Sequence, residues 1–248
     1  MIPKIIHYCW FGGNPLPDDA KKCIASWKKF FPGYEIKEWN ENNFDIDCCN
    51  YVKEAYTAKK WAFVSDYARF WILYHEGGLY FDTDVEVIKD MSDIIAQGAF
   101  MGCETDNKVV CNLGVNPGLG LGANPGLSLY KEILNHYEKI HFSGENNISE
   151  TVVTHTSKIL KRHGWIGNGK IEQVEGVAIY PPEYFCPIDY KTGKLDITPN
   201  TRSIHWYTAS WQSPYSKMKT KLQHWLGSSL TSKIINLKKE FKKIIHGR

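Results

Sequence analysis

Apolar residues recur along most of the chain at two spacings, one typical of strands and the other of helices. Short apolar runs bounded by turn residues predict strands at residues 4–10, 34–39, 79–81, 85–88, 98–102 and 109–111. Apolar residues three and four apart predict helices at residues 18–31, 50–57, 62–75, 127–141 and 150–163. Strands that alternate with helices favour an α/β fold with a mostly parallel central sheet.

Two further segments carry turn residues. Residues 112–125 are rich in Gly, Asn and Pro and predict a loop flanking a strand, which either lets the backbone approach a ligand or is purely structural. Residues 178–187 contain several prolines and predict an extended segment.

The densest chemical pattern lies where the helix at 62–75 meets the strand at 79–81. Gly77–Gly78 supplies a left-handed helix end and a chain reversal. Asp66 and Arg69 are three residues apart and share one helix face. Asp82 and Asp84 follow the strand and lie on one side of it if the strand persists that far. These four charged groups are therefore expected to converge.

Two carboxylates at one strand end suit a hard divalent cation, which prefers oxygen ligands and leaves positions open for phosphate groups. The simpler interpretation is that the sequence Asp-Thr-Asp caps a strand and begins a turn. The adjoining helix, with Asp66 and Arg69 on one face, favours the cation site.

Composition indicates one globular domain followed by a basic tail. The 248 residues are 43% hydrophobic and 23% charged, with a net charge of only +3, which gives no sign of nucleic-acid binding. From residue 214 onward nine Lys or Arg residues face one Glu, a net of +8, which leaves 21 basic and 26 acidic residues, a net of −5, before it. We expect a catalytic domain at residues 1–213 and a basic amphipathic helical tail at 214–248.

The tail carries an apolar stripe at helical spacing, formed by Leu230, Ile234, Leu237, Phe241, Ile244 and Ile245. Lysines on the opposite side make it a candidate for the headgroup region of an anionic membrane. The alternative is that the stripe packs on the catalytic domain or on a second subunit.

Cysteine usage and the N-terminus bear on the compartment. Seven cysteines without a Cys-x-x-Cys pair are typical of reduced thiols in a cytosolic protein. Residues 1–4 lack the apolar core of a signal peptide. We therefore expect a cytoplasmic protein that associates peripherally with the inner face of the cell membrane through its tail.

The central pattern resembles a known family. Ser65-Asp66-x-x-Arg69, followed by Gly77-Gly78-x-Tyr80-x-Asp82-x-Asp84, is similar to the DXD-containing sugar transferases of glycosyltransferase family 32, which are related to the glucosylating domain of the large clostridial toxins. The resemblance implies a GT-A-type nucleotide-sugar-binding fold and a divalent metal cofactor, Mn²⁺ or Mg²⁺. It also implies transfer of a hexose with retention of anomeric configuration, from a nucleotide-sugar donor to a saccharide acceptor.

The resemblance assigns roles to residues around the cation site. Asp82, Asp84 and His205 would hold the metal, while Asp66 and Arg69 would orient the donor sugar through its hydroxyl groups. Asp66, Arg69, Asp82 and Asp84 are the candidate catalytic groups.

Two tryptophans are assigned to the nucleotide. Trp10 ends a strand before a glycine-containing loop, where ligands of α/β sheets bind. A core tryptophan is the alternative, but the resemblance assigns Trp10 to stacking on uracil. Trp211 would contact the diphosphate. A UDP-sugar is thereby favoured, although GDP-mannose is also used in the family. A lipid-linked oligosaccharide, in the assembly of capsule or another surface polysaccharide, is the expected acceptor.

Two other functions also fit the sequence. The run from Phe81 to Val85 also fits the nucleophile motif of haloacid-dehalogenase-like phosphatases, although that motif normally lies early in the chain and is followed by a later acidic pair. The other rival is a non-catalytic sugar-binding protein that has kept the four charged residues.

Overall fold

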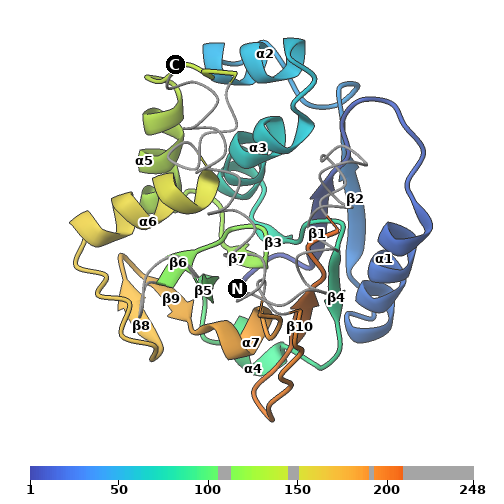
Figure 1. Ribbon diagram of the computed structural model, residues 1–248, viewed down its shortest axis with the longest axis vertical. Helices are drawn as coiled ribbons and strands as arrows, with labels where there is room; N and C mark the ends of the chain where they lie inside the picture. Colours follow the sequence, from blue (N-terminus) through green and yellow to red (C-terminus); the bar gives the residue numbers. More distant parts are fainter. Residues whose placement is uncertain (106–112, 145–150, 190–192, 209–248) are drawn as a thin grey trace, which may run out of the picture.

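A computed structural model describes residues 1–105, 113–144, 151–189 and 193–208 of the chain. Its centre is a sheet with strand order β2-β1-β3-β7-β5-β9-β8, and β6 pairs with β5 beside this path (Figure 1). The strands are β1 (Ile5–Cys9), β2 (Glu35–Trp39), β3 (Gly78–Tyr80), β5 (Phe100–Thr105), β6 (Leu113–Val115), β7 (Leu121–Ala123), β8 (Glu172–Val174) and β9 (Val177–Tyr180).

Most strands of this path run in one direction. β2, β1 and β3 are parallel, and β5 runs the same way because both β3 and β5 are antiparallel to β7. β9 is parallel to β5, and β8 reverses at the edge. The predicted α/β class with a mostly parallel sheet is therefore confirmed.

Helices cover both faces of the sheet. One face packs against α2 (Asn50–Thr57), α3 (Trp61–His75), α5 (Ser128–Tyr137) and α6 (Val152–Arg162). The other face packs against α1 (Asp18–Phe30), α4 (Ser92–Ile95), α7 (Pro182–Phe185) and a two-stranded sheet of β4 (Val85–Val87) and β10 (Ser203–His205).

Alternation along the strands divides the core into these two layers. Tyr80 of β3 faces the layer that contains α3, whereas Leu79 and Phe81 face the layer that contains α1. Because successive strand residues point to opposite faces, a run that is apolar throughout can fill both layers.

A buried histidine joins three elements at the centre. His7 of β1 is fully buried; its Nδ1 accepts a hydrogen bond from the Trp39 indole at 3.0 Å, and its Nε2 donates to the Gly77 carbonyl at 3.0 Å. A Cβ on Gly78 would come within 2.7 Å of the Ile5 carbonyl, so the glycine turn lets α3 return directly beside β1. This contact fixes where β3 begins.

The predicted helices and strands agree with the structure in most places, and the differences are local. The strand at 79–81 does not persist to Asp84, because β3 ends at Tyr80 and a turn follows. Residues 178–187 are not extended throughout, since the short helix α7 follows β9. The segment at 112–125, predicted as a loop flanking a strand, contains two short strands of its own, β6 and β7.

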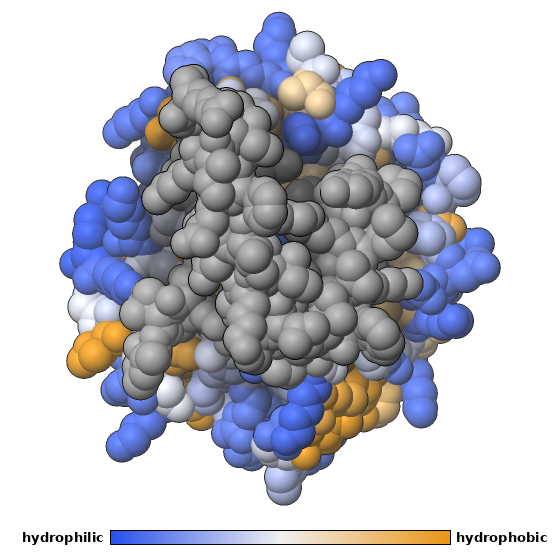
Figure 2. Space-filling model, in the orientation of Figure 1, coloured by the Kyte–Doolittle hydropathy of each residue, from blue (hydrophilic) through white to orange (hydrophobic). Residues whose placement is uncertain are grey.

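Some predicted features lie outside the described residues. These are the strand at 109–111, Trp211, the tail at 214–248 and the boundary at 213/214. In the part of the chain that the structure describes, no helix combines the length and apolarity needed to cross a bilayer. Figure 2 shows hydrophilic side chains along much of the outline of the face in view.

Candidate active site

Three strands that run in the same direction bring their carboxyl ends to one edge of the sheet. Trp10 follows β1, Asp82 lies just beyond β3, and Glu104 lies at the end of β5. Ligands of open α/β sheets bind at this edge. Here all three side chains line one cavity of about 580 Å³.

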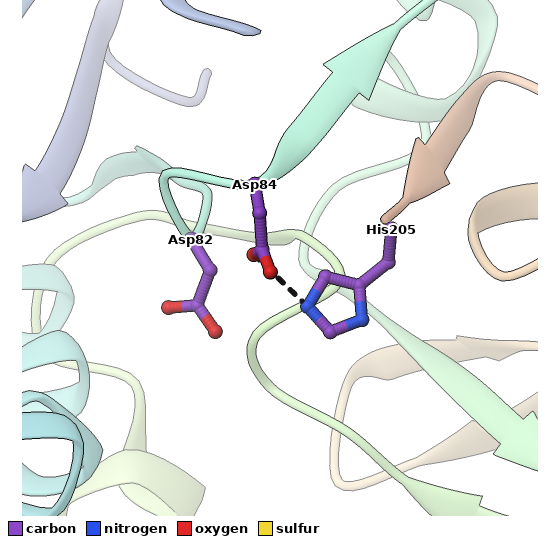
Figure 3. A group of neighbouring side chains, drawn as sticks. All are labelled: Asp82, Asp84 and His205. Atoms are coloured by element: carbon purple, nitrogen blue, oxygen red, sulfur yellow. Dashed lines mark ion pairs between the residues drawn. The ribbon is translucent and has the colours of Figure 1, made fainter. Parts of the chain in front are cut away.

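Asp82, Asp84 and His205 form a compact group of ligand atoms in this cavity (Figure 3). One donor atom from each of the three lies within 4.8 Å of the others. The two aspartates come from the turn after β3, and His205 reaches them because β10 pairs with β4, with His205 opposite Val85. The His205 Nε2 lies 3.1 Å from Asp84 Oδ1.

The chemistry of this group fits a divalent cation. Asp84 Oδ2 accepts hydrogen bonds from the Thr208 backbone at 2.9 Å and its hydroxyl at 3.2 Å, so the other oxygen is directed at His205. His205 Nδ1 is buried and has no hydrogen-bond partner among the described residues. Two carboxylates and an imidazole are a donor set that Mn²⁺ accepts.

A buried arginine of α3, Arg69, forms ion pairs with Asp66 of the same helix and with Asp82. Arg69 Nη2 lies 2.9 Å from Asp66 Oδ1 and 3.4 Å from Asp82 Oδ1. Its Nε donates to the Ser65 carbonyl at 2.9 Å, and its guanidinium lies over the Tyr80 ring at 5.1 Å. The four charged groups expected to converge therefore do so, with Arg69 linking Asp66 to Asp82.

The pKa values of the two aspartates of the motif are shifted in opposite directions. Burial raises the pKa of Asp82, even though Arg69 opposes this rise. Burial would also raise the pKa of Asp84, but the charge and hydrogen bond of His205, with the Thr208 donors, hold it at about 2. Asp84 raises the pKa of His205 against the opposing effect of burial. Asp84 is thus the permanently anionic member of the group.

The pKa of Asp66, the third aspartate near Arg69, is also shifted. Burial raises its pKa to about 7, and the Asp82 carboxylate adds to this rise while Arg69 opposes it. Its side chain also receives a backbone hydrogen bond from Val152, at the start of α6. Asp66 therefore connects α3, α6 and the DXD turn.

Aromatic side chains line another part of the cavity. Trp10 is half-buried, and its indole donates to the Asn14 carbonyl at 2.6 Å. Phe11 and Trp61 also line the cavity. Trp10 is thus a cavity residue rather than part of a closed core, which suits stacking on a planar base.

Three cavity residues went unrecognised in the sequence. Glu104 Oε2 accepts hydrogen bonds from Asn116 Nδ2 at 2.7 Å and from the Tyr207 hydroxyl at 3.0 Å. A polar residue at the carboxyl end of a buried strand is a signal for Glu104, but the strand was expected to end at Gly102. No comparable signal marks Asn116 or Tyr207.

A family model described as a glycosyltransferase sugar-binding region containing a DXD motif matches residues 17–101. This range covers α3, the glycine turn and the DXD segment, so the resemblance predicted from the sequence is confirmed there. Trp10 and His205 lie outside the matched range.

Two curated relatives match about 40% of this chain. An uncharacterised glycosyltransferase of Acanthamoeba polyphaga mimivirus is 30% identical over 109 residues, which is 42% of its length. Inositol phosphoceramide mannosyltransferase 1 of Schizosaccharomyces pombe is 27% identical over 111 residues, or 33% of its length. The matches therefore span less than half of each relative.

Two solved structures named as glycosyltransferases show a distant likeness to this chain. The PaToxG glycosyltransferase has a TM-score of 0.48 at 16% identity, with 65% of this chain and 69% of that chain covered. A glycosyltransferase involved in glycosylation of the major capsid of PBCV-1 has a TM-score of 0.46 at 12% identity, with 88% and 100% covered.

Proposed function

We propose that this protein is a metal-dependent glycosyltransferase that moves a hexose from a nucleotide-diphosphate sugar to a saccharide acceptor with retention of anomeric configuration. The observation that carries the proposal is the group of Asp82, Asp84 and His205 in the cavity that Trp10 and Arg69 also line. The match to the DXD family over residues 17–101 supports the same reaction class.

Different lining residues of the cavity suit different parts of such a donor. Trp10 offers an aromatic face to the base, and a UDP-sugar is the favoured donor. A divalent cation, Mn²⁺ or Mg²⁺, held by Asp82, Asp84 and His205 would stabilise the negative charge that develops on the diphosphate leaving group. Trp211 is proposed to contact the same diphosphate.

The sugar is proposed to lie against Asp66 and Arg69. Both line the cavity, and Arg69 fixes the relative positions of the Asp66 and Asp82 carboxylates. Carboxylate oxygens accept hydrogen bonds from sugar hydroxyls, so Asp66 would orient the ring before transfer.

The phosphatase hypothesis is less well supported by this geometry. Its nucleophile would be Asp82, but that carboxylate is engaged by Arg69 and by the Tyr80 hydroxyl at 3.0 Å. The third ligand in the group is an imidazole, His205, rather than a second acidic pair. A non-catalytic sugar-binding role shares the same residues and is separated from transfer only by turnover.

The acceptor proposal concerns the cell surface. We propose a lipid-linked oligosaccharide in surface polysaccharide assembly, which the protein would meet at the inner face of the cell membrane through its basic tail. A GDP-mannose donor is the second candidate, because one relative is named a mannosyltransferase.

A panel of sugar nucleotides tests the proposal. The purified protein is incubated with UDP-glucose, UDP-galactose, UDP-N-acetylglucosamine and GDP-mannose, with Mn²⁺ or with EDTA, and release of nucleoside diphosphate is measured. Release from at least one donor that requires Mn²⁺ is the expected result. Binding of sugar nucleotides without any release would favour the non-catalytic alternative, whereas hydrolysis of simple phosphate esters would favour the phosphatase.

A further inference from the structure

We propose that Glu104 is a catalytic carboxylate of this site and attacks the anomeric carbon of the donor sugar. The proposal rests on the proposed glycosyl transfer and adds to it the group that would form the glycosyl-enzyme bond. Glu104 lies at the end of β5, at the same sheet edge as Asp82.

Charge balance distinguishes Glu104 from the other acidic groups of the cavity. Asp66 and Asp82 share Arg69, and Asp84 is paired with His205. Glu104 also lines the cavity, but among the described residues it has no cationic partner. His205 lies near enough for the Glu104 charge to raise its pKa, but it is paired with Asp84. A carboxylate without an ion pair to any described residue can, in a partly enclosed site, stabilise the positive charge that develops on a reacting sugar ring.

Two neutral donors fix one oxygen of Glu104. Both the Asn116 amide, at 2.7 Å, and the Tyr207 hydroxyl, at 3.0 Å, donate to Oε2. Their hydrogen bonds hold the carboxylate in one orientation, and Oε1 accepts no hydrogen bond from the part of the chain that the structure describes. A held carboxylate with an oxygen directed at a ligand is suited to nucleophilic attack.

Tyr207 is itself constrained. Its backbone has φ of +50°, in the left-handed region that residues other than glycine rarely adopt, and its hydroxyl lies 2.9 Å from Cys186 Sγ. Strained backbone of this kind is concentrated at functional sites. The Tyr207 hydroxyl is thus held between Cys186 and Glu104.

A tight turn places this carboxylate beside the cation group. Asn116 Oδ1 accepts a hydrogen bond from the Gly118 N–H at 2.8 Å, and the Gly118 carbonyl accepts one from the Asp82 N–H at 3.1 Å. A Cβ on Gly118 would overlap Asp82 Oδ2 and lie 3.0 Å from Asn116 Oδ1. One residue without a side chain therefore separates the Glu104–Asn116 pair from Asp82.

The proposed reaction proceeds through two displacements at the anomeric carbon. Glu104 Oε1 attacks the anomeric carbon, the bond from that carbon to the β-phosphate oxygen breaks, and its electron pair leaves with the diphosphate. The acceptor hydroxyl then attacks the same carbon, the bond to Glu104 breaks with its electron pair returning to the carboxylate, and the hydroxyl proton passes to the diphosphate. Two inversions give retention.

Two variants of Glu104 test the proposal. In Glu104→Gln the amide oxygen can still accept from both donors, so the fold and the binding of Mn²⁺ and UDP should stay within about threefold of wild type by calorimetry. Turnover of the donor should fall by at least about 1,000-fold. Glu86→Gln is the matched control, because Glu86 bonds the Trp206 indole and lies outside the cavity.

Chemical rescue separates a nucleophile from a positioning group. In Glu104→Ala, azide should enter the space left by the carboxylate and yield a glycosyl azide of inverted configuration. Both results together support the proposal. Turnover of Glu104→Gln within tenfold of wild type, or a Glu104→Ala variant that binds Mn²⁺ and UDP but forms no glycosyl azide, would overturn it. Failure of the wild-type protein with every donor would instead refute the proposed function.

Discussion

At the scale of single residues, Asp82 and Asp84 have different environments although only one residue separates them. Asp84 is held anionic by His205 and Thr208, whereas burial raises the pKa of Asp82 beside Arg69. Asp84 therefore provides the fixed negative charge of the proposed metal site, and Asp82 connects that site to the sugar-binding residues.

Replacing Asp84 with Asn should weaken metal binding strongly and lower stability moderately, with the fold intact. The variant loses a ligand charge without creating a cavity, so Mn²⁺ affinity should fall by more than about 100-fold, the upper end for loss of an outer-shell partner. Because the pKa of Asp84 is lowered to about 2 from 3.8, its loss should also cost about 2 kcal/mol of folding free energy at pH 7. Titration calorimetry and urea unfolding measure both. Mn²⁺ affinity equal to wild type would exclude Asp84 as a ligand.

Replacing Arg69 with Ala should destabilise the protein as well as stop turnover. Arg69 is only 3% exposed, and its loss leaves Asp66 and Asp82 buried without their shared cation. Urea unfolding at pH 7 should show a loss of about 3 kcal/mol or more. Turnover should fall severely, while the folded variant should still bind free nucleoside diphosphate.

Arg162→Ala is the matched control for this prediction. Arg162 forms an exposed ion pair with Glu132, so its replacement should change stability by less than about 1 kcal/mol. An equally small loss for Arg69→Ala would show that the buried ion pairs do not hold the site together.

At the scale of elements, local hydrophobic periodicity predicted most of the helices and strands. It could not predict which strands distant in sequence would pair. The helix α3 and the glycine turn have strong periodicity and turn signals of their own. β10 has three residues and meets β4 only through the folded topology, so periodicity could not place His205 beside Asp84. That pairing was expected only from the family resemblance. Glu104 was missed because β5 continues to Thr105.

The burial of His7 predicts a pH-dependent stability of the β1–β2–α3 junction. Burial lowers the pKa of His7 from 6.5 to about 4, although the Glu76 charge and the hydrogen bond to the Gly77 carbonyl oppose this shift. Between pH 4 and 6.5 the unfolded chain binds a proton on His7 more readily than the folded chain does. The contribution of neutral His7 to the free energy of unfolding is therefore complete above pH 6.5 and is lost as the pH falls towards 4. His7 alone should make the protein about 2 kcal/mol less stable at pH 5 than at pH 7.

Urea unfolding at both pH values measures this difference, and His7→Gln serves as the comparison. The variant should show a pH dependence smaller by about 2 kcal/mol, because carboxylates elsewhere contribute equally to both proteins. Identical pH dependence in the two proteins would contradict the assignment.

At the scale of the whole molecule, charge is divided between an acidic stretch at residues 1–213 and a basic stretch at 214–248. Deleting residues 215–248 removes nearly all of the tail, in which basic residues give a net charge of +8. If the tail binds anionic membrane, the full-length protein should sediment with anionic liposomes at low salt and less at high salt, because each basic side chain contributes about 1 kcal/mol near the surface. The truncated protein should remain in the supernatant. Equal sedimentation would favour packing of the apolar stripe on protein.

We propose that Asp82, Asp84 and His205 hold a divalent cation against the diphosphate of a nucleotide sugar. Anomalous diffraction at the manganese edge, from crystals grown with Mn²⁺ and UDP, would locate that cation. We expect one manganese peak bonded to all three side chains and to the diphosphate, with the uracil against Trp10. Bound UDP with no manganese at these residues, or manganese held elsewhere in the cavity, would contradict it.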